Sequence, residues 1–161
     1  MYIEDDDAAF KLVGIILREQ APDIRLIRAR DGDEALAFLR GDEPNGQVPE
    51  PDLIILDLNL PKKNGFQVLS ELKANESLRS IPVVIFSNSS QANDKNDALG
   101  RGAQDYITKP SSFDLFVEAV RTACSLRDRS AGPTKLDSAG ASAGTGYNHG
   151  NPADPSGASK K

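Results

Sequence analysis

The run Leu53-Ile54-Ile55-Leu56-Asp57 lies near the middle of the chain, and the other segments are interpreted from it. Its first four residues are all apolar, so neither face of the segment has a polar position. This pattern is typical of a central parallel strand that helices cover on both sides. The predicted strand, residues 53–56, ends at Asp57, and in an open α/β sheet the ligand crevice lies at the carboxyl ends of the strands.

Short β-type segments on both sides of this strand alternate with longer segments of helical period. The predicted strands are residues 1–4, 24–29, 53–56, 82–86 and 104–108. The predicted helices are residues 7–20, 31–41, 65–74, 91–99 and 112–127. This alternation predicts the α/β class, with a parallel sheet built from crossover connections.

Two helices carry signals that can be checked residue by residue. Asp31 and Glu34 have the spacing of a capping box, which predicts that a helix begins there. For the helix over residues 112–127, the helical period predicts an apolar face. The residues of that face are Phe113, Phe116, Val117 and Val120.

The apolar residues divide the chain into two parts. Residues 1–129 hold 38 of the Leu, Ile, Val and Phe residues, and residues 130–161 hold only Leu136. We therefore expect one folded domain over 1–129 and a disordered Gly/Ala/Ser/Pro-rich tail over 130–161. Residues 41–52 exceed the usual αβ loop and carry three prolines, which indicates an insertion more than a binding epitope.

Composition excludes several classes of function. The formal net charge is -5, which argues against a nucleic-acid-binding face. No apolar run approaches the roughly 20 residues of a membrane span, so we expect a cytoplasmic protein without membrane contact. The lone Cys124 and the lone His149 exclude most His or Cys metal sites and His-based nucleophile pairs, and we expect both residues to be inert.

Reactive side chains follow the predicted strands at their carboxyl ends. They are Glu4 and Asp5, Asp57, Ser87, and Lys109. Three carboxylates on one rim repel one another unless a cation holds them, and hard oxygen ligands suit Mg²⁺. An ammonium and a hydroxyl opposite the metal would complete a cradle for a phosphoryl group, with Asp57 as the nucleophile.

At these positions the sequence closely resembles the receiver domain of bacterial two-component response regulators. The resemblance rests on residues 2–6, 53–65, 83–87 and 102–110, and it covers the chain from residue 1 to about 128. It implies a flavodoxin-like, doubly wound five-stranded parallel sheet in the order 2-1-3-4-5, with five helices. The segment 57–61 and the long proline-bearing loop resemble single-domain regulators that partner phytochrome-type kinases.

The resemblance also implies a role for each site residue. Asp57 would accept a phosphoryl group from the phosphohistidine of a histidine kinase, and the domain would catalyse only its own phosphorylation and dephosphorylation. The implied Mg²⁺ ligands are Asp5, Asp57, the Asn59 backbone carbonyl and, through water, Glu4. The implied phosphoryl and switch residues are Lys109, Ser87 and Tyr106.

Two further positions are expected to control water. Asn59 and Ser89 stand two residues beyond Asp57 and Ser87, where they would order or exclude the water that removes the phosphate. The implied partners are a histidine kinase or phosphotransfer protein and an unidentified downstream protein. Homodimer formation on phosphorylation stays open.

Two alternatives stay open beside this interpretation. Phosphatases of the haloacid dehalogenase type also use an Asp nucleophile with Mg²⁺, but Asn59 stands where they carry a general-acid Asp. A pseudo-receiver that binds partners without phosphorylation is the other. Steady phosphate release from a small phosphoester would favour the phosphatase, labelling that stops at one phosphoryl group per chain would favour the receiver, and no labelling at all would favour the pseudo-receiver.

Overall fold

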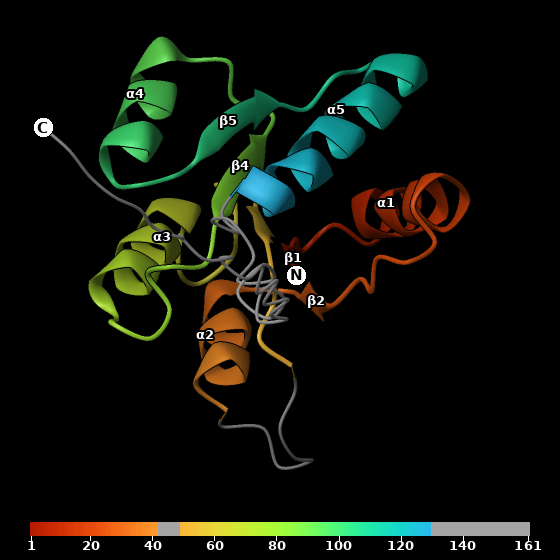
Figure 1. Cartoon of the computed structure of the whole chain (residues 1–161). Coiled ribbons are helices and arrows are strands. Elements are labelled where there is room, and N and C mark those ends of the chain that lie inside the picture. The colour runs from red at the N-terminus through yellow and green to blue at the C-terminus, as the bar shows by residue number, and fades with distance from the viewer. Residues whose placement is uncertain (42–48, 130–161) are drawn as a thin grey trace, which may run out of the picture.

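The computed structural model describes residues 1–41 and 49–129 (Figure 1). Within these ranges the strands are β1 (Tyr2–Ile3), β2 (Arg28–Ala29), β3 (Ile54–Leu56), β4 (Val83–Ser87) and β5 (Asp105–Thr108). The helices are α1 (Asp7–Gln20), α2 (Gly32–Arg40), α3 (Gly65–Ala74), α4 (Ala92–Gly100) and α5 (Phe113–Ser125), with a 3₁₀ turn, η1 (Leu126–Arg129), after α5. The strands and helices alternate as the sequence predicts.

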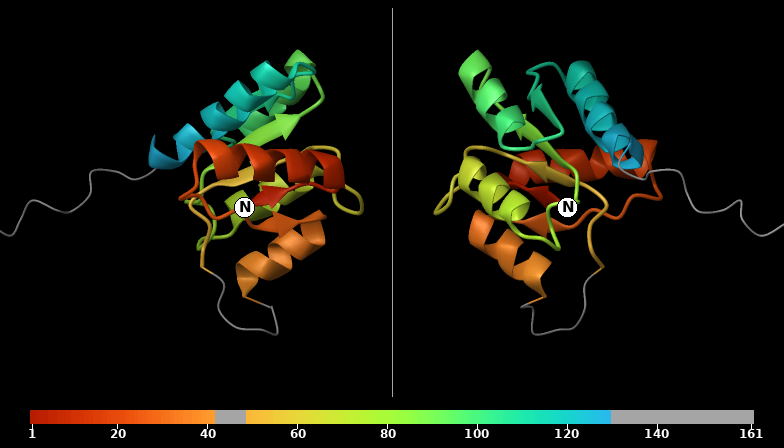
Figure 2. Two further views of the ribbon diagram at one scale, coloured as in Figure 1. Left: turned by 90° about the vertical axis from the view of Figure 1, so that its right-hand side faces the viewer. Right: turned by 60° about the vertical axis from the view of Figure 1, so that its left-hand side comes forward.

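The five strands form one parallel sheet in the order β2-β1-β3-β4-β5. This order confirms the flavodoxin-like arrangement. Helices α1 and α5 cover one face, and α2, α3 and α4 lie on the other (Figure 2). Each face has its own apolar cluster, so the sheet is buried on both sides and its polar residues gather at the strand ends.

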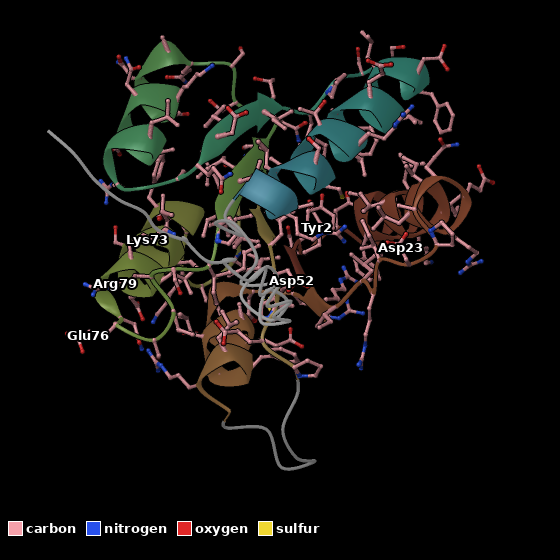
Figure 3. All side chains as sticks on the ribbon, in the orientation of Figure 1. Tyr2, Asp23, Asp52, Lys73, Glu76 and Arg79 are labelled. Carbon is pink, nitrogen blue, oxygen red and sulfur yellow. The ribbon has the colours of Figure 1, made fainter. Side chains whose placement is uncertain are left out.

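Side chains of alternating orientation fill these two clusters. Ile3 on β1 packs with α2 and α3, whereas Tyr2 packs with α1 and α5. Tyr2 lies in the interior of the molecule (Figure 3), and its ring is 6.4 Å from those of Phe10 and Phe86. Alternation along β1 therefore points Tyr2 and Glu4 to the same side of the sheet.

Strand boundaries are the main difference from the sequence-based expectation. The strand predicted over residues 24–29 pairs only at Arg28 and Ala29, opposite Tyr2 and Ile3. Ile27 contributes one more bond, because its carbonyl accepts the Tyr2 N–H at 2.8 Å. Positions 24–26 have no β1 residue opposite them in this register, so their apolar side chains do not make them a strand.

Helix N-termini show a second difference. The Asp31 side chain accepts the Glu34 N–H at 2.9 Å and caps α2, as predicted. Glu34 accepts the Arg30 N–H at 2.6 Å, so the reciprocal half of the capping box is missing. A complete capping box, with both bonds at 3.0 Å, instead joins Asn64 and Gln67 at the start of α3.

The predicted apolar face of α5 is correct except at one position. Phe116 and Val120 are buried and Val117 is half-buried, but Phe113 is 60 % exposed. Phe113 is the first residue of α5 and lies beyond the strand ends, where no sheet covers it. Cys124 is half-buried on the same helix, and burial raises the pKa of its thiol.

None of the described helices is long and apolar enough to cross a membrane. The predicted tail over 130–161, with His149, and positions 42–48 of the long loop lie outside the described residues.

Candidate functional site

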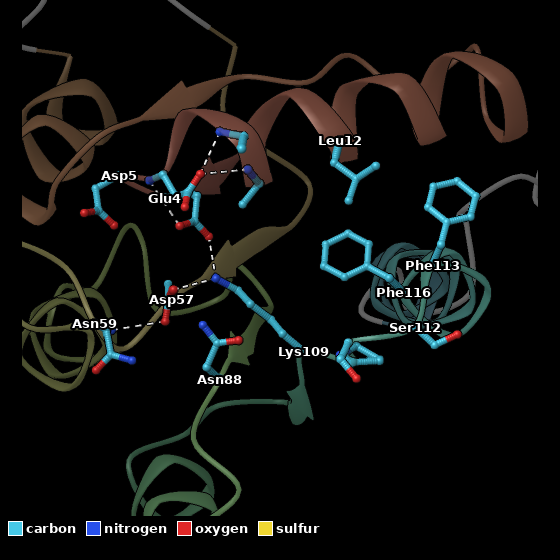
Figure 4. A pocket seen from close by; sticks show the side chains of 15 residues that line it. Glu4, Asp5, Leu12, Asp57, Asn59, Asn88, Lys109, Ser112, Phe113 and Phe116 are labelled. Atoms are coloured by element: carbon cyan, nitrogen blue, oxygen red, sulfur yellow. Dashed lines mark hydrogen bonds and ion pairs between the residues drawn. The ribbon is translucent and has the colours of Figure 1, made fainter.

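A pocket of about 540 Å³ opens at the carboxyl ends of the strands (Figure 4). Its polar wall carries Glu4, Asp5, Asp57, Asn59 and Lys109, five of the predicted site residues. Leu12, Phe113 and Phe116 form an apolar wall on α1 and α5. Acidic, basic and apolar side chains thus share one opening.

Strand pairing places these residues at the same edge. Glu4, Asp57 and Lys109 directly follow β1, β3 and β5. The Asp57 N–H donates to the Ile3 carbonyl at 3.1 Å, and the Lys109 N–H donates to the Ser87 carbonyl at 2.8 Å. These bonds continue the parallel ladders past the strands, so the side chains that follow them converge.

Lys109 joins two carboxylates at the centre of the pocket. Its Nζ lies 2.6 Å from Asp57 Oδ2 and 2.6 Å from Glu4 Oε2. The side chains of Lys109, Glu4 and Asp57 are only 8 %, 2 % and 5 % exposed. Burial lowers the pKa of Lys109, but the hydrogen bonds to Asp57 and Glu4 outweigh it and hold that pKa above its usual value.

Glu4 has two further donors. The Tyr2 hydroxyl donates to Glu4 Oε2 at 2.5 Å, and the Asp6 N–H donates to Oε1 at 3.2 Å. Burial raises the pKa of Tyr2, and its hydrogen bond to Glu4 raises it further, so the phenol stays protonated. The sequence interpretation missed this contact. The spacing of Tyr2 and Glu4 along one strand was the available signal.

The other oxygen of Asp57 is held by the backbone. Asp57 Oδ1 accepts the Asn59 N–H at 3.1 Å. Helix α3 begins very close to this turn, since a Cβ at Gly65 would lie 2.3 Å from the Asp57 carbonyl oxygen. Only a residue without a Cβ allows this approach, so Gly65 helps to fix the backbone that carries Asp57.

The predicted metal ligands lie around one side of the pocket. Asp5 and Asn59 are exposed, and both line the opening with Asp57. Carboxylate and carbonyl oxygens are the donors that Mg²⁺ and Mn²⁺ prefer, so the chemistry of this set fits a hard divalent cation. In residues 1–41 and 49–129 no three His, Cys, Asp or Glu side chains gather as a metal site by themselves. The third ligand in the predicted set is a backbone carbonyl.

Arg28 fixes the loop that carries the acidic pair. Its guanidinium donates to the Glu4 carbonyl at 3.2 Å and the Asp5 carbonyl at 3.0 Å, and it pairs with Asp7 at 2.5 Å. The same group lies 4.7 Å from the centre of the Phe10 ring. The sequence gives no signal for this clamp, because its partners are more than 17 positions away along the chain.

Ser87, Ser89 and Tyr106 form a neighbouring cluster and do not line the pocket. Ser87 is fully buried, and its Oγ lies 3.5 Å from the Ser89 N–H. The Tyr106 hydroxyl donates to the Ser89 carbonyl at 2.8 Å, and the Ser89 hydroxyl donates to Asp94. Burial raises the pKa of Tyr106. The exposed Asn88, which follows Ser87, lines the pocket instead and was not predicted from the sequence.

Known proteins are similar to this chain in sequence and in fold. Residues 1–121 match the family model described as "Response regulator receiver domain". Response regulator Rcp1 of Synechocystis sp. is 40% identical over 117 residues, which are 72% of this chain and 80% of Rcp1.

Solved structures agree with the sequence relatives. The phosphorylated cyanobacterial phytochrome response regulator RcpA has a TM-score of 0.70 and 36% identity, over 75% of this chain and 86% of that chain. The Mn²⁺-bound form of Rcp1 has a TM-score of 0.68 and 38% identity, over 75% and 87%. The chain therefore belongs to the response regulator receiver domain family and is the receiver domain of a two-component response regulator.

Proposed function

We propose that Asp57 is the phosphoacceptor of this receiver domain and that the phosphoryl group comes from a phosphohistidine of a histidine kinase. The observation that carries the proposal is the contact of the Lys109 ammonium with Asp57 at 2.6 Å inside a pocket that is open to a donor. A nearly buried carboxylate beside a fixed cation can attack phosphorus, because the cation offsets the charge that gathers on the phosphoryl oxygens.

Membership of the receiver domain family supports this proposal. Receiver domains bind a divalent metal, have a histidine kinase as partner, and are not true enzymes beyond their own phosphorylation and dephosphorylation. This membership decides against the haloacid dehalogenase phosphatases. Mg²⁺ as the metal, a histidine kinase as the donor and Asp57 as the phosphorylated residue are the proposed assignments.

In the proposed transfer, an oxygen of Asp57 forms a bond to phosphorus while the phosphorus–nitrogen bond of the phosphohistidine breaks. The electron pair of that bond stays on the imidazole nitrogen. Lys109 and the Ser87 hydroxyl then donate to phosphoryl oxygens. Asp5, Asp57 and the Asn59 carbonyl would hold Mg²⁺, with Glu4 acting through water, and the ion supplies charge neutralisation when it is bound.

We further propose how the phosphorylated state is read. The phosphoryl group adds about -1.5 to -2 charge, toward which the Ser87 hydroxyl moves. Tyr106 would turn into the vacated space and release the Ser89 carbonyl, which it now binds at 2.8 Å. The surface of α4, β5 and α5 would change, and a downstream protein or a second copy would recognise it.

The donor is proposed to be a phytochrome-type kinase. RcpA is named as a phytochrome response regulator, and it shares 36% identity with this chain. The apolar wall of the pocket supports docking of a protein donor, because Phe113, which lines the same pocket as the acceptor, is 60 % exposed. We also propose that residues 1–129 are the whole phosphorylated unit and that residues 130–161 are a tail outside it.

Incubation with acetyl phosphate and Mg²⁺ tests the assignment. Labelling should stop at one phosphoryl group per chain, and Asp57→Asn should abolish it. Steady release of phosphate from a small phosphoester would contradict a receiver, whereas slow release from acetyl phosphate would not, because the domain also removes its own phosphoryl group. Failure of the wild-type chain to label would favour a pseudo-receiver.

A further inference from the structure

Tyr2 is a buried polar residue that the proposed transfer does not use. It is fully buried, and its hydroxyl donates to Glu4 Oε2 at 2.5 Å. Its ring packs against those of Phe10 and Phe86, with ring centres 6.4 Å apart in each pair. The hydroxyl therefore has a fixed position behind Glu4, which lines the pocket, whereas Tyr2 itself does not.

Tyr2 ends a continuous line of hydrogen bonds that leads to the phosphoacceptor. Glu4 Oε2 accepts from both Tyr2, at 2.5 Å, and Lys109, at 2.6 Å. Lys109 in turn donates to Asp57 at 2.6 Å. Since the two donors share one oxygen, the strength of the Glu4–Lys109 contact depends on Tyr2.

Phosphorylation changes which acceptors the Lys109 ammonium contacts. The new phosphoryl group brings about -1.5 to -2 charge to Asp57 and draws the ammonium toward it, away from Glu4. Glu4 is 1 % exposed, so apart from the water proposed to join it to Mg²⁺ it has little access to solvent. Without Tyr2, its Oε2 would lose both of its side-chain donors, which is costly for a buried carboxylate oxygen.

We propose that Tyr2 is a positioning residue that lets Lys109 move from Glu4 to the phosphoryl group. Its hydroxyl keeps Glu4 hydrogen-bonded throughout, together with the Asp6 N–H on the other oxygen. This inference rests on the proposed function of Asp57. It assigns to Tyr2 an effect on the rate of phosphorylation that is separate from its packing in the core.

The test is Tyr2→Phe, which removes the hydroxyl and keeps the ring. At saturating Mg²⁺, the rate of labelling by acetyl phosphate should fall by roughly tenfold, the size expected for one hydrogen bond to a charged group. Mg²⁺ affinity should change less than twofold, since Tyr2 does not line the pocket. Tyr2→Leu, which also lacks the hydroxyl, should slow labelling by at least as much.

A double variant separates positioning from packing. If Tyr2 acts by donating a hydrogen bond to the charged Glu4 carboxylate, then Tyr2→Phe should slow labelling less than twofold in a Glu4→Gln background. Thr122→Val is the matched control, because its hydroxyl binds the Glu118 carbonyl at 2.9 Å on the exposed side of α5. Its rate should equal that of the wild type.

The outcomes are distinguishable. A wild-type chain that labels and a Tyr2→Phe chain that labels at the same rate would overturn this inference and leave Asp57 as phosphoacceptor. If Tyr2→Phe slows labelling equally in the wild-type and the Glu4→Gln backgrounds, the inference is overturned as well. A wild-type chain that takes up no phosphoryl group would overturn both the proposed function and this inference.

Discussion

Replacing Lys109 by Met should strongly destabilise the domain at neutral pH. The change removes the ammonium that lies 2.6 Å from both Glu4 and Asp57 and leaves two carboxylates that are 2 % and 5 % exposed. Removing one partner from a buried ion pair costs about 3–5 kcal/mol. For a folded part of this size that is a fall in melting temperature of about 10–18 °C.

The stability that Lys109 contributes depends on pH. The folded-state pKa of Lys109 is raised, so its contribution is fully present below the unfolded-state pKa, about 10.4, and is lost as the pH rises through the folded value. In Lys109→Met this contribution is absent at every pH. The difference from the wild type should therefore be present at neutral pH and shrink as the pH rises above about 10.

Thermal unfolding of three variants without added metal checks the reasoning. Lys62→Met is the matched control, because Lys62 also lies 2.6 Å from a carboxylate, that of Asp31, but its side chain is 63 % exposed. Its melting temperature should fall far less. Adding Asp57→Asn to Lys109→Met should restore part of the loss. Equal losses for both lysine variants, or no recovery with Asp57→Asn, would refute the argument.

Three further predictions concern the surroundings of the acceptor. Gly65→Ala should lower both the stability of the domain and its rate of labelling, because the new Cβ would lie 2.3 Å from the Asp57 carbonyl oxygen. Gly100→Ala, where nothing lies within 4 Å of the new Cβ, should change neither, and identical behaviour of the two variants in unfolding and labelling assays would contradict this. Arg28→Met should weaken Mg²⁺ binding severalfold because it releases the Glu4 and Asp5 carbonyls, whereas Arg30→Met, which loses only a 3.0 Å contact with Asp7, should leave the affinity unchanged. Equal Mg²⁺ affinities of the two variants in a thermal-shift titration would count against the clamp. Asn59→Arg should slow loss of the phosphoryl group by crowding the approach of water, and an unchanged half-life would show that this position does not control it.

The sequence predicted the alternation of strands and helices and the residues of the rim, because both follow from local patterns. An apolar run that ends in a reactive side chain identifies a parallel strand and its carboxyl end at once, as at Asp57. Helix α3 has the predicted bounds, Gly65–Ala74. The sheet order itself came from the family resemblance and not from spacing.

The remaining differences depend on contacts between distant segments. Residues 24–26 look like a strand, but pairing requires an opposite residue, which the register with β1 does not supply. Phe113 has the period of a core residue, yet α5 begins beyond the sheet. The Arg28 clamp and the Lys109 bridge to Glu4 join residues 24 and 105 positions apart, so no local pattern reveals them.

The most direct test of the central claim is to locate the phosphoryl group on the chain. After incubation with acetyl phosphate and Mg²⁺, borohydride reduction converts the side chain of an aspartyl phosphate into that of homoserine, which peptide mass spectrometry can place. We expect one modified position, residue 57, in the wild-type chain and none in Asp57→Asn. Phosphate found on a serine such as Ser87, or on another aspartate in the wild-type chain, would contradict it.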